Sequence, residues 1–252
     1  MSWIEQYASS RNYKLLACNS LHEAEKELNY INMLRQNRVD GIVMCSHTLE
    51  IEAYKNVGLP IVSFDRILSP SIPYIANDNY TGGELATKHL IEQGCKKLLH
   101  ISGPLQYDLL ANRRSDAFQI TCMKSDIAYE IIEGAHVKAT FEDNWDFIHQ
   151  NIGDKLTEVD GIFCSNDIFA YTLYEYVKSV GIKVPEELKI VGYDYHSFTR
   201  MLQTPKITTI KQPIREIGNA LASSLIDQIE NGIHDNGSNT VLAVELIKGE
   251  TT

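Results

Sequence analysis

The sequence predicts an α/β protein with parallel sheets, divided into two doubly wound subdomains. Short β-branched runs alternate with helical patterns of about 12 to 18 residues, which is typical of βαβ units. The 252 residues suffice for one large domain or two smaller ones. An extended segment, Thr204–Pro213, separates two strand-rich blocks from a helix and a final strand, which favours two subdomains joined by crossovers. A single long sheet has the same periodicity and stays open as an alternative.

Eight short apolar runs, most of them containing Val, Ile or aromatic residues, are expected to form strands, because such side chains suit a buried pleated surface. The predicted strands are Lys14–Cys18, Gly41–Cys45, Ile61–Phe64, Leu98–Ile101, Ala128–Ile132, Gly161–Cys164, Lys189–Gly192 and Val241–Ile247.

Four helices with one apolar face are expected between these strands. They span His22–Asn37, a segment ending at Gly94, the run from Asp167 to Gly181, and the run from Pro213 to Gly232. Glycine commonly follows a helix, and Asp167 is expected to cap the helix that it precedes.

A further helical segment, Trp3–Arg11, opens the chain and leads into the strand predicted at Lys14. Folds of the βαβ type normally open with a strand. We therefore expect that at least one upstream strand of the parent protein is missing from this sequence.

The overall charge argues against nucleic-acid binding by this chain alone. The formal net charge is −10, whereas phosphate binding requires clustered Lys and Arg. No run approaches the roughly 20 apolar residues of a membrane span, and the N-terminal residues lack a secretory signal pattern. Five widely spaced cysteines are expected to be reduced, with Cys18, Cys45 and Cys164 in the core. These features predict a cytoplasmic protein without membrane contact.

No catalytic or cofactor-binding signature is present. The sequence contains no G-x-S-x-G, no phosphate-binding P-loop and no H-E-x-x-H motif. The histidines lack metal-ligand spacing, and His89 is expected to be a packing residue. The sequence therefore predicts a protein that is not an enzyme and has neither a cofactor nor a metal site.

Polar residues recur where predicted strands end. Asp65-Arg66 follows one strand, Asn166-Asp167 another, and Asp194 a third. Ligands of open α/β sheets bind at the carboxyl ends of the strands. Carboxylates and amides can pair with hydroxyl groups, and Asp65 with Asp194 would repel an anion unless arginines compensate. A neutral sugar or a cation is therefore the expected ligand. Taken singly, each residue could merely cap a helix.

Several motifs, in this order, resemble the effector-binding core of the LacI (lactose repressor) family of bacterial transcription regulators, from about Tyr13 to Thr252. The motifs are VDGIV (Val39–Val43), IVSFDR (Ile61–Arg66), DNYTGGELATKHLIEQG (Asp78–Gly94), ISGP (Ile101–Pro104), FCSND (Phe163–Asp167), and GYD and TTIKQP within Lys189–Pro213.

The resemblance implies two flavodoxin-like subdomains of the periplasmic-binding-protein type, joined by three crossovers with a ligand cleft between them. The expected N-terminal subdomain is 1–77 plus 213–238, and the expected C-terminal subdomain is 78–212 plus 239–252, with the third crossover at 236–239. The family's helix-turn-helix domain is absent from this sequence. Operator DNA would be bound only through such an N-terminal domain.

The resemblance also assigns effector-binding residues. Asp194 matches the aspartate that binds sugar hydroxyls, Asn166 the cleft asparagine and Asp65 an aspartate at the cleft edge. Arg114 matches the arginine of the family's R-x-x-G-F pattern, here with Ala117 in place of the glycine. The remaining expected contacts are Phe141, stacking on the ligand, and Asp108. Their alternatives are a surface charge for Arg114, a core aromatic for Phe141 and a loop residue for Asp108.

The expected function is therefore sugar sensing by the dimerisation core of a repressor, with a sucrose-operon repressor as one candidate. A small-molecule effector would shift a homodimer between DNA-binding and released states. The alternative is a solute-binding protein of a sugar transporter, which has the same architecture.

Overall fold

The computed structural model describes residues 1–21, 23–36, 39–46, 54, 58–105, 109–134, 140–197, 205–232 and 239–252. They form two compact units. Unit 1 comprises Met1–Asn77 and Pro213–Leu242, and unit 2 comprises Asp78–Gln212 and Ala243–Thr252.

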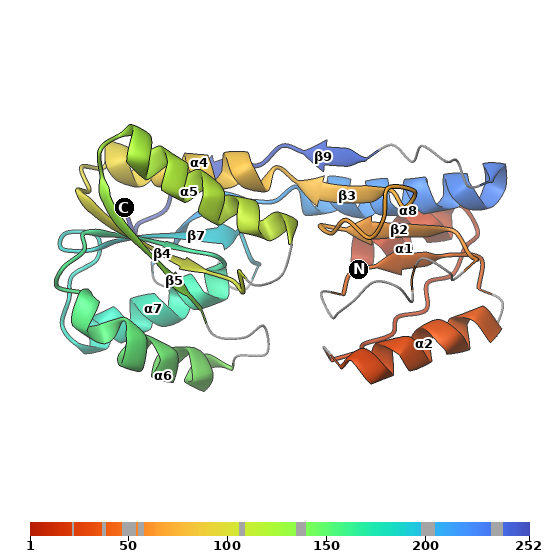
Figure 1. Cartoon of the computed structure of the whole chain (residues 1–252), viewed down its shortest axis with the longest axis horizontal. Coiled ribbons are helices and arrows are strands. Elements are labelled where there is room, and N and C mark those ends of the chain that lie inside the picture. The colour runs from red at the N-terminus through yellow and green to blue at the C-terminus, as the bar shows by residue number, and fades with distance from the viewer. Residues whose placement is uncertain are drawn as a thin grey trace. The chain divides into compact units, whose positions relative to one another are not determined.

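The described part of unit 1 is a parallel sheet with helices on both faces (Figure 1). Its sheet order is β1-β2-β3-β9, with every neighbouring pair parallel. The helices are α1 (Ser2–Ser10), α2 (Ala24–Gln36) and α8 (Ile214–Asn231), and the strands are β1 (Ile42–Met44), β2 (Ile61–Phe64), β3 (Tyr74–Asn77) and β9 (Thr240–Leu242).

Successive side chains of β2 pack on opposite faces of this sheet, because neighbouring residues of a strand point to opposite sides. Ile61 packs in a cluster with Ile31 of α2. The next residue, Val62, packs with Ile217 of α8 and Ile4 of α1. Unit 1 therefore has two small apolar clusters, one under α2 and one under α8 and α1.

The strand predicted at Lys14–Cys18 is wrong, since this segment has no regular secondary structure. A cavity of about 450 Å³ is lined both by this segment and by β1. A strand needs a neighbour for its backbone hydrogen bonds, and within the described residues β1 pairs only with β2. The prediction of Cys18 and Cys45 as core residues is also wrong, because both are exposed, whereas Cys164 is buried.

Unit 2 contains the larger sheet, with the order β10-β8-β7-β6-β4-β5 among the described residues. All neighbours are parallel except β10, which runs antiparallel to β8. The helices are α4 (Asn79–Glu92), α5 (Arg113–Lys124), α6 (Phe141–Asn151) and α7 (Asp167–Ser179), with short 3₁₀ turns η1 (Leu110–Asn112) and η2 (Gly153–Lys155). The strands are β4 (Lys97–Ser102), β5 (Ala128–Glu133), β6 (Gly161–Cys164), β7 (Lys189–Asp194), β8 (Thr208–Lys211) and β10 (Glu245–Ile247).

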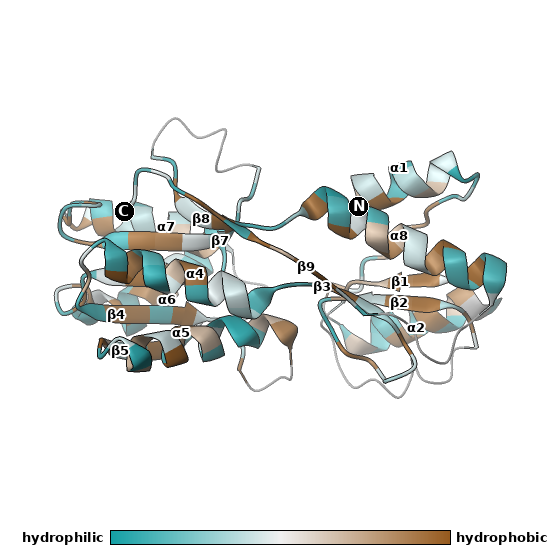
Figure 2. Ribbon diagram, turned by 90° about the horizontal axis from the view of Figure 1, so that it is seen from above, coloured by the Kyte–Doolittle hydropathy of each residue, from teal (hydrophilic) through white to brown (hydrophobic). Residues whose placement is uncertain are grey.

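Helices α4 and α5 cover one face of this sheet, and α6 and α7 cover the other (Figure 1). All four residues of β6 are buried, as expected for a strand covered on both faces. Phe163 packs with Leu90 and Phe118, while its neighbour Ile162 packs with Leu173 on the opposite face. Figure 2 shows the labelled strands β1, β2 and β4 mainly in the apolar colour, whereas the helices that cover the sheets carry both polar and apolar residues.

Several elements differ from the sequence predictions. The strand expected at Val241–Ile247 is two strands, β9 and β10, which belong to different sheets. Because β9 pairs with β3, unit 1 extends to Leu242, past the crossover expected at 236–239, of which only Asn239 is described. Strands β3 and β8 and helices α5 and α6 were not predicted, because their sequences are short or mainly polar.

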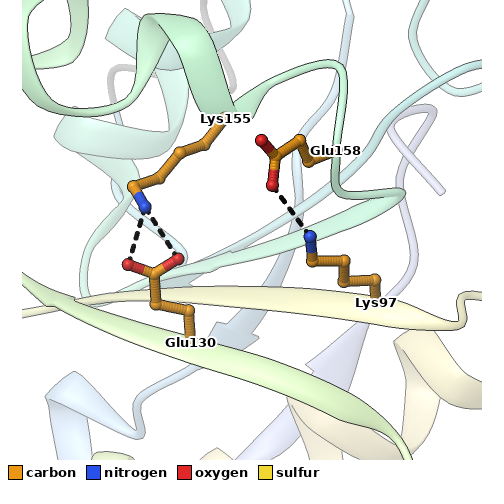
Figure 3. A network of polar contacts seen from close by, with 4 residues as sticks. All are labelled: Lys97, Glu130, Lys155 and Glu158. Carbon is orange, nitrogen blue, oxygen red and sulfur yellow. Dashed lines mark hydrogen bonds and ion pairs between the residues drawn. The ribbon is translucent and has the colours of Figure 1, made fainter.

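Exposed ion pairs join the surface of unit 2 near β4 and β5 (Figure 3). Lys97 contacts Glu158 at 2.9 Å, and Lys155 contacts Glu130 at 2.8 Å. Exposed pairs of this kind contribute little to stability. They give this surface a polar character. Across the described part of the chain, no helix is long and apolar enough to cross a membrane.

Candidate functional site

The candidate site in unit 2 lies at the carboxyl ends of the parallel strands β4, β6, β7 and β8. Their parallel pairing places these ends at one edge of the sheet. Helix α7 begins directly after β6 at the same edge. Edges of this kind bind ligands in open α/β sheets.

Arg114 is the central cation of this edge. It lies in the first turn of α5 and is only 8% exposed, so it is not the surface charge considered as an alternative. Its Nη1 donates to the carbonyl oxygen of Ser165 at 2.8 Å, and its guanidinium lies 3.5 Å from the ring centroid of Tyr193. Arg114 therefore links the end of β6 to the end of β7, beside two other predicted site residues.

Close helix packing brings Asn79 to the same arginine. The Nε of Arg114 donates to Oδ1 of Asn79 at 2.8 Å. Helices α4 and α5 approach closely, since a Cβ added at Gly83 would lie 2.4 Å from the carbonyl oxygen of Arg114. A Cβ at Gly82 would similarly lie 2.6 Å from the hydroxyl oxygen of Tyr193. The Gly-Gly pair on α4 thus leaves room for the arginine and the ring beneath it.

Asp194 ends β7 in a strained conformation. Its φ is 109°, and φ of the following Tyr195 is 54°. Non-glycine residues rarely adopt positive φ, and such strain concentrates at functional sites. Oδ1 of Asp194 accepts a hydrogen bond from Nε2 of Gln212 at 2.5 Å, just beyond the end of β8. The half-buried carboxylate is therefore held in a defined orientation at the sheet edge.

Asn166, not Asp167, is the residue that caps α7. Oδ1 of Asn166 accepts from the backbone N–H of Phe169 at 2.8 Å, which leaves its amide NH₂ as the group for donating to a ligand. The prediction for Asp167 is wrong because that side chain is fully buried and accepts from Thr209 and from the backbone of His196. Burial raises the pKa of Asp167 to about 6.

The last two predicted residues are less closely integrated. Phe141 begins α6 after the capping residue Thr140 and is 44% exposed, so it is not the core aromatic considered as an alternative. Its ring lies 5.8 Å from that of Trp145. Asp108 lies outside the described residues.

Unit 1 has its own polar edge at the carboxyl ends of β1 and β2. Asp65 follows β2, is 5% exposed and has a φ of 55°. Its backbone N–H donates to the carbonyl oxygen of Ile75 at 2.9 Å. Asp65 and Asp194 thus both lie at the carboxyl end of a parallel strand and both have a positive φ, each in its own unit.

A buried polar cluster supports this edge of unit 1. Glu27 accepts from the hydroxyl of Ser46 at 2.6 Å and also from the hydroxyl of Tyr54. Arg66 is buried beside them, in electrostatic contact with Glu27 and Tyr54. Burial and the neighbouring Glu27 raise the pKa of Tyr54, while burial lowers the pKa of Arg66.

The chemistry of both edges favours a neutral, hydroxyl-rich ligand. Each edge has one arginine and at least one aspartate, so neither presents an uncompensated positive charge for an anion. Carboxylate, amide and guanidinium groups together can accept from and donate to hydroxyls. Among the described residues, no group of three or more His, Cys, Asp or Glu side chains is placed to hold a metal ion.

Three residues of the unit 2 edge were missed from the sequence: Asn79, Tyr193 and Gln212. Gln212 follows β8, so recognising Thr208–Lys211 as a strand would have placed it at the edge with Asp194. Asn79 and Tyr193 contact Arg114 because α4, α5 and β7 pack together, and this tertiary packing cannot be predicted from any local sequence pattern.

Comparison with known proteins identifies the family. Residues 87–252 match a model of the periplasmic binding protein-like domain. The chain is 35% identical over 253 residues to the sucrose operon repressor of Pediococcus pentosaceus, covering 100% of this chain and 76% of that protein. It is 33% identical over 228 residues to the ribose operon repressor of Halalkalibacterium halodurans, covering 90% of this chain and 67% of that protein.

A solved structure with the same fold supports this result. The periplasmic binding protein/LacI transcriptional regulator from Alkaliphilus metalliredigens, complexed with D-xylulofuranose, has a TM-score of 0.89 and 33% sequence identity. The match covers 100% of this chain and 92% of that chain. The relatives are transcriptional repressors, neither enzymes nor solute-binding proteins of transporters. The chain therefore belongs to the LacI family of transcriptional regulators and corresponds to the effector-binding core of such a repressor.

Proposed function

We propose that the effector is a neutral sugar and that it binds at the unit 2 edge through Asp194, Arg114 and the amide of Asn166. The observation that carries the proposal is the fixed orientation of Arg114 by its hydrogen bonds to Asn79 and Ser165. Preorganised donors bind without a further ordering cost. Asp65 of unit 1, Phe141 and Asp108 complete the proposed set of contacts.

The sugar class rests on charge and on the relatives. The paired charges of both edges suit an uncharged polyol better than a phosphate or a carboxylate. The relatives include sucrose and ribose operon repressors, and the solved structure contains D-xylulofuranose. Sucrose and five-carbon sugars are therefore the first ligands to test, with a sucrose-operon repressor as the leading subtype.

The proposed assembly is a cytoplasmic homodimer that binds operator DNA through an N-terminal DNA-binding domain outside this sequence. The net charge of −10 fits a chain that does not bind DNA by itself. In unit 2, the outermost strand β5 lies beside α5, on which Met123 is 64% exposed and Ile120 is 37% exposed. A dimer contact would bury these side chains. Sedimentation analysis is expected to give twice the chain mass of 28.5 kDa.

Effector control would follow from a population shift between two states of the dimer. A ligand shifts such an equilibrium only by the difference between its affinities for the two states. In this proposal Asp194 supplies that difference, because its strained backbone and its contact with Gln212 define one arrangement of the edge.

A thermal-shift panel of sucrose, D-fructose, D-ribose, D-xylulose and their phosphates tests the proposal. A ligand at about 100 times its Kd stabilises the native state by about 2.7 kcal/mol. One neutral sugar is expected to raise the melting temperature of the wild type and to have no effect on Asp194→Ala. The matched control, Asp154→Ala, removes an exposed carboxylate in η2 and should respond like the wild type.

Two outcomes would contradict the proposal. If only phosphorylated sugars or a purine base such as hypoxanthine stabilise the wild type, the effector class is wrong. If a neutral sugar stabilises Asp194→Ala as strongly as the wild type, the binding site is wrong.

A further inference from the structure

Asp167 is a fully buried carboxylate that the proposed ligand contacts do not use. It is the first residue of α7, next to the capping Asn166. Burying a charged carboxylate is costly unless its oxygens are well paired. The partners of this side chain therefore indicate its role.

Both oxygens of Asp167 bind groups that flank the strained turn. Oδ1 accepts from the hydroxyl of Thr209 on β8 at 2.6 Å. Oδ2 accepts from the backbone N–H of His196 at 2.7 Å. Thr209 in turn accepts from the backbone N–H of Tyr195 at 3.4 Å. The two amides that follow Asp194 are thus held directly or indirectly by one carboxylate.

The backbone of β7 leaves space for this arrangement. A Cβ added at Gly192 would lie 2.4 Å from Oδ1 of Asp167 and 3.2 Å from the Cβ of Ala170. A side chain at this position would displace the carboxylate from Thr209. Gly192 is therefore required at the point where Asp167 reaches across β7 toward β8.

We propose that Asp167, acting through Thr209 and the amide of His196, is a positioning residue that holds the strained turn at Asp194 and Tyr195 in the conformation that binds the effector. The inference rests on the proposed function, because it takes Asp194 as the sugar ligand. Asp167 does not touch the sugar in this arrangement. It fixes the backbone from which the Asp194 side chain extends.

Because burying the charge of Asp167 costs stability, a role in positioning the turn can be distinguished from a role in stabilising the fold. Burial raises its pKa to about 6, so the carboxylate is still mostly charged at neutral pH and the folded protein carries the cost of burying that charge. Among the described residues, the titratable groups in electrostatic contact with it are the thiol of Cys164 on β6 and the imidazole of His196 after β7. An uncharged replacement should preserve or improve stability while weakening the hold on the turn.

The test compares Asp167→Asn and Thr209→Val with the wild type. Asparagine is uncharged and offers one acceptor oxygen where aspartate offers two, so it cannot accept from both Thr209 and the N–H of His196 as the carboxylate does. Affinity for sucrose and for D-ribose is measured by calorimetric titration, and amide hydrogen exchange is measured across residues 193–197. For the sugar that the wild type binds, both variants are expected to bind about ten-fold more weakly, the loss of one hydrogen bond to a charged group. Exchange at Tyr195 and His196 should accelerate.

Thr172→Val is the matched control, because it removes a buried hydroxyl of α7 that donates to the carbonyl of Ile168 and does not reach the turn. It should keep wild-type affinity and wild-type exchange at residues 193–197. Asp167→Asn should keep its melting temperature within about 2 °C of the wild type or exceed it. A lower melting temperature combined with unchanged exchange at the turn would show a merely structural role and overturn the inference.

A pH profile adds a readout that packing alone would not move. Sugar affinity of the wild type should fall as pH decreases from 7.5 to 5, because protonation removes an acceptor oxygen, and the profile of Asp167→Asn should be flatter. If Asp194→Ala loses binding but Asp167→Asn binds like the wild type at every pH, only this inference fails. If Asp194→Ala itself keeps wild-type affinity, the proposed function fails.

Discussion

In unit 2 every residue of β6 is buried, whereas in unit 1 the outer strands β1 and β9 are partly exposed. The larger sheet carries two apolar clusters that continue through its strands, and its longer strands run six residues. The strands of unit 1 are three or four residues long, and a cavity of about 450 Å³ lies beside β1.

The difference extends to the two polar edges. In unit 2, Arg114 is fixed by contacts from α4, β6 and β7, which belong to a densely packed body. In unit 1, the cluster of Glu27, Ser46 and Tyr54 lines the cavity. A rigid body holds binding groups more accurately than a loosely packed one. We therefore expect the affinity for the effector to depend mainly on unit 2 and unit 1 to be the less stable part.

The largest expected loss of unfolding free energy comes from a substitution in the core of unit 2. Ile162→Ala removes a fully buried side chain of β6 and should cost about 4 kcal/mol of unfolding free energy. Ile42→Ala, in the partly exposed β1 beside the cavity, should cost about 1 kcal/mol, because few contacts are lost there.

Tryptophan fluorescence can assign these losses to the units. Trp3 lies in α1 of unit 1 and Trp145 in α6 of unit 2, so Trp3→Phe and Trp145→Phe each leave one reporter. In urea, Trp3 should report unfolding at a lower concentration than Trp145. If Trp3 and Trp145 report the same urea midpoint, and Ile162→Ala and Ile42→Ala lose the same unfolding free energy, the proposed difference in stability between the units is wrong.

The next effect is a pH dependence confined to unit 2. His100 is fully buried between Phe118 and Phe163, and burial lowers its pKa to about 4. Its depressed pKa means that its contribution is present above pH 6.5 and is lost as pH falls toward 4, by about 3 kcal/mol. Asp167 has the opposite sign, because its raised pKa favours the folded state as pH falls below 6.

The two groups offset each other in the wild type and can be separated by substitution. In Asp167→Asn, the unfolding free energy followed by Trp145 should decrease between pH 6.5 and 4. In His100→Gln, it should increase over the same range. If the unfolding free energy changes with pH in the same direction and by the same amount in both variants, neither group has the pKa shift that its burial implies.

A smaller loss of stability is expected from a substitution where α4 packs against α5. Gly83→Ala places a Cβ against the backbone of Arg114 and should destabilise unit 2 by about 2 kcal/mol, even though alanine favours helix. Gly103→Ala is the control, because a Cβ there meets no atom within 4 Å. Equal urea midpoints for the two variants would show that the helix crossing adjusts and that Arg114 is not tightly held.

The sequence predicts the strands whose own residues favour strand formation and misses those that form because of neighbouring strands. Ile61–Phe64 and Gly161–Cys164 are predicted with their observed bounds, because β-branched runs form buried strands. Lys14–Cys18 is apolar but has no β-branched residue, and within the described residues it pairs with no strand. The polar Thr208–Lys211 is a strand because it lies between β7 and β10.

The candidate site shows the same division. A carboxylate or amide after a strand places Asp194, Asn166 and Asp65 at sheet edges from sequence alone. The cap of α7 is different, because adjacent Asn166 and Asp167 have similar capping preferences and only the neighbouring Thr209 decides between them. The burial of Arg114 also depends on residues distant in sequence, and no periodicity reports it.

The most direct test of the central claim is calorimetric titration of sucrose and D-ribose into the wild type and Asp194→Asn. Asparagine keeps the size of the side chain and removes the charge that accepts sugar hydroxyls. One of the two sugars should bind the wild type about 100-fold more tightly than the variant, which corresponds to about 2.7 kcal/mol. Equal affinity of wild type and variant for that sugar would contradict the account.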